Sequence, residues 1–154
     1  MKKWILLFII ICLTTTACTN SPHTIKFDHA DLSKELKKEG INPKLPTQFP
    51  MKVEKYEIQR PPHESVIHEI MFTGENGEIF NLRVHTGEVT FGEDMKEEEV
   101  EISGDQGFFS DHDAAGLEVV WEDGEYTYLL NYQTVGLDTE VTKETMIGVA
   151  ESFK

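Results

Sequence analysis

Two dipeptides typical of tight turns, Asn76-Gly77 and Asp123-Gly124, constrain the fold most strongly. Each stands between two runs in which polar and apolar residues alternate, the pattern of a half-buried strand. Asn-Gly and Asp-Gly favour the type I′ turn, in which both central residues have positive φ. The sequence therefore predicts two β-hairpins. Their predicted strands are 64–73, 78–85, 117–122 and 125–132.

Two further segments, 51–59 and 99–103, also alternate with a period of two and are predicted to be strands. Before the first of them, Pro43, Pro46 and Pro50 fix φ and favour an extended crossing without regular structure. The predicted sheet is therefore entered through a proline-rich segment.

A helix is predicted near each end of the domain. Leu32 and Leu36 share one face of a short helix over 31–40. The apolar residues of 142–153 recur at helical spacing behind Thr142, a typical N-cap residue. The order of elements predicts a single α+β domain, in which one curved antiparallel sheet packs against the C-terminal helix and the short N-terminal helix.

The first residues have the pattern of an export signal, because Lys2-Lys3 precedes an apolar run over 4–13 and Ala17-Cys18 follows it. The run is shorter than the roughly 20 apolar residues that span a bilayer. A small residue directly before a cysteine resembles the bacterial lipobox. This resemblance implies that the signal peptide 1–17 is removed and that Cys18 receives lipid.

This interpretation divides the chain into the signal peptide, a lipidated cysteine and tether over 18–29, and one domain over 30–154. We expect the protein on the extracytoplasmic face of the cell membrane. Loss of Lys2-Lys3 changes the formal net charge from −14 to −16. Such an acidic chain disfavours nucleic acid as a partner. Cys12 leaves with the signal and Cys18 carries lipid, so no disulfide is expected.

Three stretches together resemble domain of unknown function 4367, found in exported and membrane-attached proteins of spore-forming Gram-positive bacteria. They are the proline-rich segment 43–53, the segment 117–128 with Trp121 and Tyr126, and the segment 142–153 with Ala150-Glu151-Ser152. The resemblance implies the location and the fold. It implies no chemistry, because that family has no settled activity.

The segment that starts with Asp111 mimics a calcium-binding EF-hand loop. Asp111 is its first position, and Asp113, Gly116 and Glu122 follow at the expected spacing. Ala115 stands where a ligand is required, and a strand rather than a helix is predicted to follow. We therefore expect no calcium site.

Residue types of a hydrolase triad and of a zinc site also occur. Ser110, His112 and Asp113 lie close together in sequence, where strand or turn geometry is expected to point them apart. The best zinc set lacks the paired spacing of a zinc motif. That set is His63, His68 and His85. We predict no catalytic, metal or cofactor residue, and Cys18 is the only predicted site.

Several aromatic residues could line a binding wall, but core packing is the ordinary use of such side chains. They are Phe108, Phe109, Trp121, Tyr126, Tyr128 and Tyr132. We expect a filled core, with Trp121 on the C-terminal helix. The predicted function is a non-enzymatic binding or interaction domain on a lipoprotein. The alternatives are a lipid-handling or envelope-stress-sensing module of the lipoprotein-carrier type and an envelope hydrolase.

Overall fold

The computed structural model describes residues 24–59, 66–87, 89–90, 92, 95–112, 116–133 and 140–154. The helices are α1 (Ala30–Lys38) and α2 (Lys143–Glu151). The strands are β1 (Ile25–Lys26), β2 (Gln48–Phe49), β3 (Val53–Gln59), β4 (Ile67–Gly74), β5 (Ile79–Thr86), β6 (Glu98–Ile102), β7 (Asp105–His112), β8 (Gly116–Asp123) and β9 (Tyr126–Tyr132).

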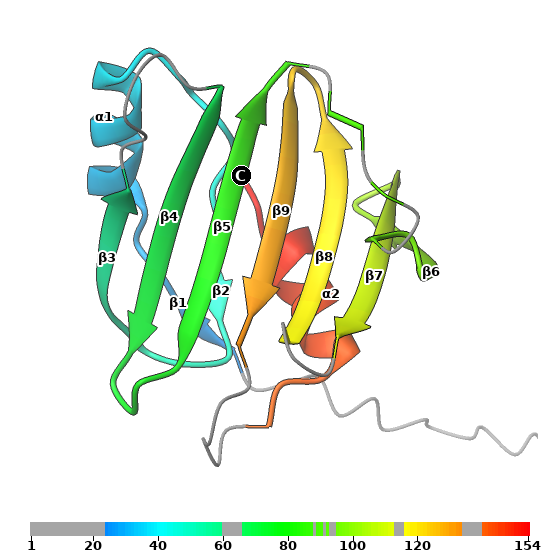
Figure 1. Cartoon of the computed structure of the whole chain (residues 1–154). Coiled ribbons are helices and arrows are strands. Elements are labelled where there is room, and N and C mark those ends of the chain that lie inside the picture. Colours follow the sequence, from blue (N-terminus) through cyan, green and yellow to red (C-terminus); the bar gives the residue numbers. More distant parts are fainter. Residues whose placement is uncertain are drawn as a thin grey trace, which may run out of the picture.

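Seven of these strands form one curved antiparallel sheet in the order β3-β4-β5-β9-β8-β7-β6, and β1 pairs with β2 beside it. Figure 1 shows both helices on one face of the large sheet, with α1 near β3 and α2 behind β8 and β9. We call this the inner face and the opposite one the outer face. The predicted α+β architecture is confirmed.

The core fills the space between the inner face and the helices. Alternate residues of β9 point into it, and Leu130 and Tyr132 have no exposed surface. From the helices, Leu36 of α1 and Met146 and Val149 of α2 are buried to the same extent. The predicted cap of α2 is present, since the Thr142 hydroxyl accepts a hydrogen bond from the backbone N–H of Thr145 at 3.3 Å.

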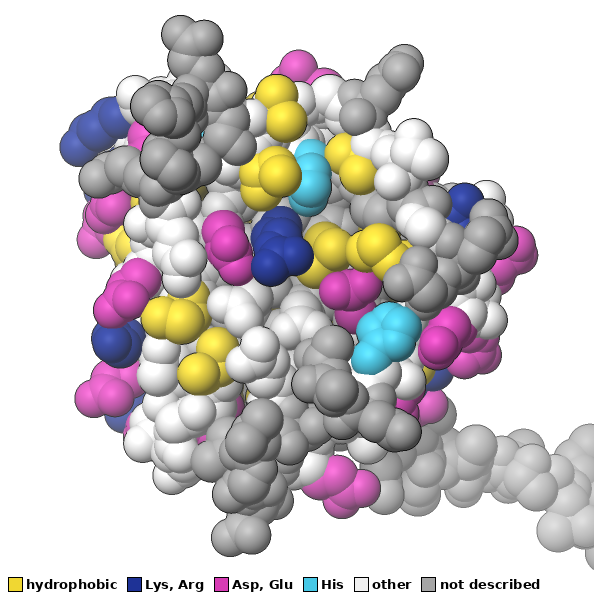
Figure 2. Space-filling model, in the orientation of Figure 1, with side chains coloured by type: hydrophobic (Ala, Val, Ile, Leu, Met, Phe, Trp, Pro, Cys, Tyr) yellow, Lys and Arg dark blue, Asp and Glu magenta, His cyan; other side chains and the backbone are white. Residues whose placement is uncertain are grey.

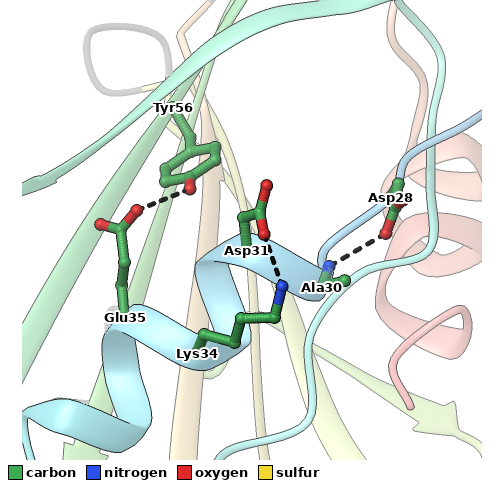
Figure 3. A network of polar contacts seen from close by, with 6 residues as sticks. All are labelled: Asp28, Ala30, Asp31, Lys34, Glu35 and Tyr56. Carbon is green, nitrogen blue, oxygen red and sulfur yellow. Dashed lines mark hydrogen bonds and ion pairs between the residues drawn. The ribbon is translucent and has the colours of Figure 1, made fainter.

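Helix α1 is attached to the neighbouring strand by a polar contact that Figure 3 shows. The Tyr56 hydroxyl on β3 donates to Oε1 of Glu35 at 3.0 Å. Burial and the nearby Glu35 carboxylate raise the pKa of Tyr56. At the start of the helix, Oδ1 of Asp28 accepts from the backbone N–H of Ala30 at 3.0 Å. The helix is thus fixed at its first turn and at its middle.

The residues just before α1 differ from the prediction of a tether. Ile25 pairs with Phe49 in the small sheet. The ring centroid of Phe27 lies 5.6 Å from that of Phe49 and 5.5 Å from that of Phe72. The folded domain therefore begins before residue 30, because Ile25 is paired in a strand and Phe27 packs against the core.

The proline-rich crossing is joined to the C-terminal residues and to β9. Leu45 and Lys154 exchange two backbone hydrogen bonds of 3.0 and 3.1 Å. The backbone N–H of Lys44 donates to the Tyr128 hydroxyl at 2.9 Å. Burial raises the pKa of Tyr128 far above its usual value, so this hydroxyl stays neutral. These contacts hold the crossing over the inner face.

A β-bulge interrupts the regular alternation of side chains that was predicted for β3. Val53 pairs with Gly74 and Lys55 with Thr73, so the register shifts between them. Before the bulge the odd-numbered Val53 packs against the core, and after it the even-numbered Tyr56 and Ile58 do so. One extra residue reverses the faces of a strand, because side chains alternate with a period of two.

Both predicted hairpins are present, but neither has the predicted type I′ turn. At 75–77 only Gly77 has positive φ, and the N–H of Gly74 bonds to the carbonyl of Glu78 at 2.8 Å. At the second hairpin Asp123 pairs with Tyr126, which leaves Gly124 as the one turn residue with positive φ. This is the arrangement of a type II′ turn.

Strand β7 lies in a segment for which the sequence predicted no strand. It forms a hairpin with β6 through Ser103 and Gly104, which both have positive φ, at 54° and 97°. This is the type I′ pattern that the other two turns lack. Ser103 is the one non-glycine residue with positive φ in the described ranges.

Candidate functional site

Cys18, the predicted lipid anchor, lies outside the described residues, which begin at Thr24. Its lipidation therefore stays a prediction. The first element after it is β1, which starts at Ile25.

The two described histidines of the candidate zinc set, His68 and His85, do not come together. His68 pairs with Val84, a fully buried residue of the inner face. His85 pairs with Ile67 and projects from the outer face. His63 lies outside the described residues. His68 faces a carboxylate, with Nδ1 3.7 Å from Oε2 of Glu39 at the end of α1.

The triad candidates are arranged differently from the prediction. Ser110 and His112 lie two residues apart on β7, so both project from the same face instead of pointing apart. Within the described residues they form no catalytic pair, because the Ser110 hydroxyl is buried and has no hydrogen-bond partner there. Nδ1 of His112 lies 3.9 Å from Oε1 of Glu97. Asp113 is outside the described residues.

The strand register also separates the calcium candidates. Asp111 pairs with Leu117 on β8, and Glu122 lies five residues further along that strand. Five residues of strand correspond to about 17 Å. Ligands of one calcium ion lie within about 2.6 Å of it. Asp111 and Glu122 therefore cannot share one ion in this fold.

The aromatic residues divide between the two faces of the sheet. Trp121 stacks on Tyr128 with ring centroids 5.0 Å apart, and Phe153 meets it edge-on at 5.0 Å. Trp121 is 3% exposed and its strand β8 contacts α2, which confirms the predicted packing beside the C-terminal helix. Phe109 and Tyr132 also belong to the core cluster. Phe108, whose pairing partner is Val120, lies on the outer face.

The outer face carries a row of mixed character, which we call the outer row. It consists of Glu69, Arg83, Leu129, Val120 and Phe108, each paired with the next across adjacent strands. Leu129 and Val120 are buried, yet they lie outside the main core cluster. Figure 2 shows this face, on which apolar, acidic and basic side chains and histidines lie side by side.

Two adjoining hollows lie at one end of the outer face and share Glu122 as a wall. Hollow A measures about 440 Å³ and hollow B about 480 Å³. Each falls in the range of about 300 to 1,000 Å³ that small-molecule sites occupy. The lining of hollow A includes Lys96, Asp105, Phe108, Val120 and Glu122. The lining of hollow B includes Thr86, Glu122, Glu125, Tyr126 and Thr127.

A smaller, polar hollow of about 180 Å³ lies at the other end of the outer face. Asn81 and Asn131, which pair across β5 and β9, contribute to its lining, together with Arg83 and Glu118. Charged and amide groups beside Leu129 can bind a polar ligand by hydrogen bonds. None of these three hollows lies between the sheet and the helices.

His85 contributes an unusual polar atom to the outer face. Its Nε2 is buried and makes no hydrogen bond within the described part of the chain. Burial lowers the pKa of His85, and the positive charge of Arg83 lowers it further. The ring is therefore held in its neutral form at neutral pH.

Two classes of site find no support in the described ranges. Within them, no group of three or more His, Cys, Asp and Glu side chains is arranged to hold a metal ion. Neither of the two described helices is long and apolar enough to span a bilayer.

Comparison with protein families, curated proteins and solved structures finds no match for the chain.

Proposed function

We propose that this protein is a lipoprotein, held on the extracytoplasmic face of the cell membrane by lipid on Cys18, and that its domain is a non-enzymatic binding module. The sequence carries the first half of the proposal, because Ala17-Cys18 follows a short apolar run behind Lys2-Lys3. The likeness to domain of unknown function 4367 belongs to the same proposal.

One structural observation carries the second half, namely the contrast between a filled inner face and a hollowed outer face. Hollows A and B adjoin and share Glu122, and their walls combine apolar and charged groups. A few polar groups beside apolar walls are typical of ligand sites. Among the described residues, no base is bonded to the hydroxyl of Ser110, the serine of the triad candidates. A binding role therefore fits the site better than hydrolysis.

The lipid-handling alternative requires an open apolar groove between sheet and helices. That space is occupied, since Trp121 is 3% exposed and Met146 and Val149 are 0% exposed. The packing in the described part of the chain therefore favours a binding module that uses the outer face.

Acylation of Cys18 is the decisive test. Wild-type protein made in a bacterial host that processes lipoproteins, and fed labelled palmitate, should carry label and sediment with membranes. The Cys18→Ser variant should lose the label and remain unprocessed or be shed. The Cys12→Ser variant is the matched control and should keep the label, because Cys12 leaves with the signal. Undiminished labelling of Cys18→Ser would refute the proposed anchor.

A further inference from the structure

The folded domain begins at one particular end of the large sheet. Ile25 of β1 pairs with Phe49, whose ring centroid lies 4.8 Å from that of Phe72 and 5.4 Å from that of Phe80. Phe72 and Phe80 each lie within two residues of the β4–β5 turn, which the Gly74 and Glu78 backbones close. Figure 1 shows β1 starting at this end of the sheet. We call it the proximal end.

The chain between anchor and domain is short. Six residues, 19–24, separate Cys18 from Ile25. Seven steps of at most about 3.6 Å limit the Cα–Cα distance to about 25 Å in any conformation. The start of the domain must therefore stay within about 25 Å of the bilayer surface if Cys18 is acylated.

Hollows A and B lie at the opposite, distal end. Hollow B includes Thr86 and Gly87 at the end of β5, and Gly124 and Glu125 in the β8–β9 turn. Strand β5 has eight residues, which correspond to about 23 Å from first to last. The length of the sheet thus separates these hollows from the point of attachment.

Two physical effects favour an upright domain over one that lies on the bilayer. The tether holds the first residues of the domain within about 25 Å of the bilayer, which excludes the orientations in which the domain would overlap the lipid. The formal charge of −16 that remains after signal removal is also repelled by anionic headgroups. Both effects move the distal end away from the lipid.

We infer that the anchored protein stands with the β4–β5 turn toward the membrane and presents hollows A and B, one strand length further out, to partners in the space beyond it. This inference rests on the proposed lipid anchor. The inference adds that the binding site receives its ligand from the extracytoplasmic space beyond the membrane and not from the lipid. A lipid-handling domain would instead need its opening near the leaflet.

Single labelled cysteines can measure the orientation, because Cys12 leaves with the signal and Cys18 is blocked by lipid. Glu75→Cys places a probe in the proximal β4–β5 turn, and Glu125→Cys places one in the distal β8–β9 turn. Both residues are exposed and acidic, so the pair is matched in charge and accessibility. Unchanged melting temperatures would show that both variants fold.

The acylated variants are labelled with a fluorophore and inserted into phosphatidylcholine vesicles that carry a nitroxide on some headgroups. Quenching at position 75 should exceed that at position 125 by roughly twofold or more, since the sheet separates the two probes. Adding phosphatidylglycerol should increase the ratio through repulsion. The same labels on protein that begins at residue 19, and so has neither the signal with Cys12 nor the acylated Cys18, should show no quenching.

The two proposals fail in different ways. Protein that carries no acyl chain and does not bind vesicles would overturn the anchor and the orientation together. Acylated, vesicle-bound protein with equal quenching at both positions, or stronger quenching at position 125, would overturn the orientation alone.

Discussion

The two faces of the large sheet are built from the same strands but differ in what they can tolerate. On β9, Tyr128, Leu130 and Tyr132 point inward and are at most 1% exposed. Between them, Leu129 and Asn131 point outward, and both line the small polar hollow. The inner face therefore provides most of the stability through close packing. The outer face is freer to carry residues that serve recognition.

The largest expected effect tests whether the inner face is filled. Trp121→Ala should lower the free energy of unfolding by about 3 to 5 kcal/mol, as large aromatic truncations in cores do. Urea denaturation followed by circular dichroism measures this loss. A loss below about 1 kcal/mol, together with saturable binding of an apolar fluorescent probe by the native wild type, would show an open groove. The lipid-handling alternative would then rank first.

A consecutive pair of leucines sharpens the comparison between faces. Leu130 is fully buried among core residues, whereas Leu129 is 5% exposed and borders a hollow. Leu130→Ala should cost about 2 to 5 kcal/mol, and Leu129→Ala less than about half as much, because the outer surroundings can rearrange around the lost side chain. Equal losses in urea denaturation would mean that the outer row is a second rigid core.

The hydrogen bond that joins the proline-rich crossing to β9 should contribute less to the free energy of unfolding. Tyr128→Phe removes the hydroxyl that accepts from the backbone N–H of Lys44. The expected loss is about 1 kcal/mol, the usual contribution of one hydrogen bond. Tyr126→Phe, which removes the more exposed bond from the N–H of Asn42, is the matched control. A larger loss for Tyr126→Phe than for Tyr128→Phe in thermal unfolding would contradict this order.

The smallest expected effect is a pH dependence from the outer face. The pKa of His85 is lower in the folded protein than its ordinary value near 6.5. The unfolded chain therefore binds the proton more readily, and stability is lost as pH falls below about 6.5. His85→Gln should lose less of its melting temperature between pH 7 and pH 5.5 than wild type. Identical pH profiles would contradict a role for His85.

The elements with strong local patterns could be predicted from the sequence. Both helices were predicted in this way. The first prediction used Leu32 and Leu36 at helical spacing, and the second used Thr142 before a run of apolar residues at helical spacing. Strand β7 was missed, because its Asp105, Gly107 and Asp111 are residue types depleted in strands. It forms because β8 pairs with one of its edges and β6 with the other. Such tertiary context overrides local preference.

The candidate site was harder to predict, because it depends on which side of a strand each residue faces. From the sequence, His68 and His85 were grouped as possible zinc ligands. In the sheet His68 pairs with Val84, which precedes His85 on β5, so the two histidines lie on opposite faces. Phe108 and Phe109 are adjacent in sequence, but only Phe108 reaches the outer face. No sequence pattern indicated hollows A and B, since their walls come from separate segments.

The strand order has a consequence for how the chain folds. β3, β4 and β5 follow one another in the sequence and are neighbours in the sheet, and the same holds for β6, β7, β8 and β9, so each group can form from contacts close in sequence. The groups meet only where β5 pairs with β9, with Thr86 opposite Tyr126. Closing that long loop costs entropy before any contact rewards it, so this seam should form last and limit the folding rate. Substitutions along the β5–β9 seam should therefore slow folding, whereas those within either group should mainly speed unfolding.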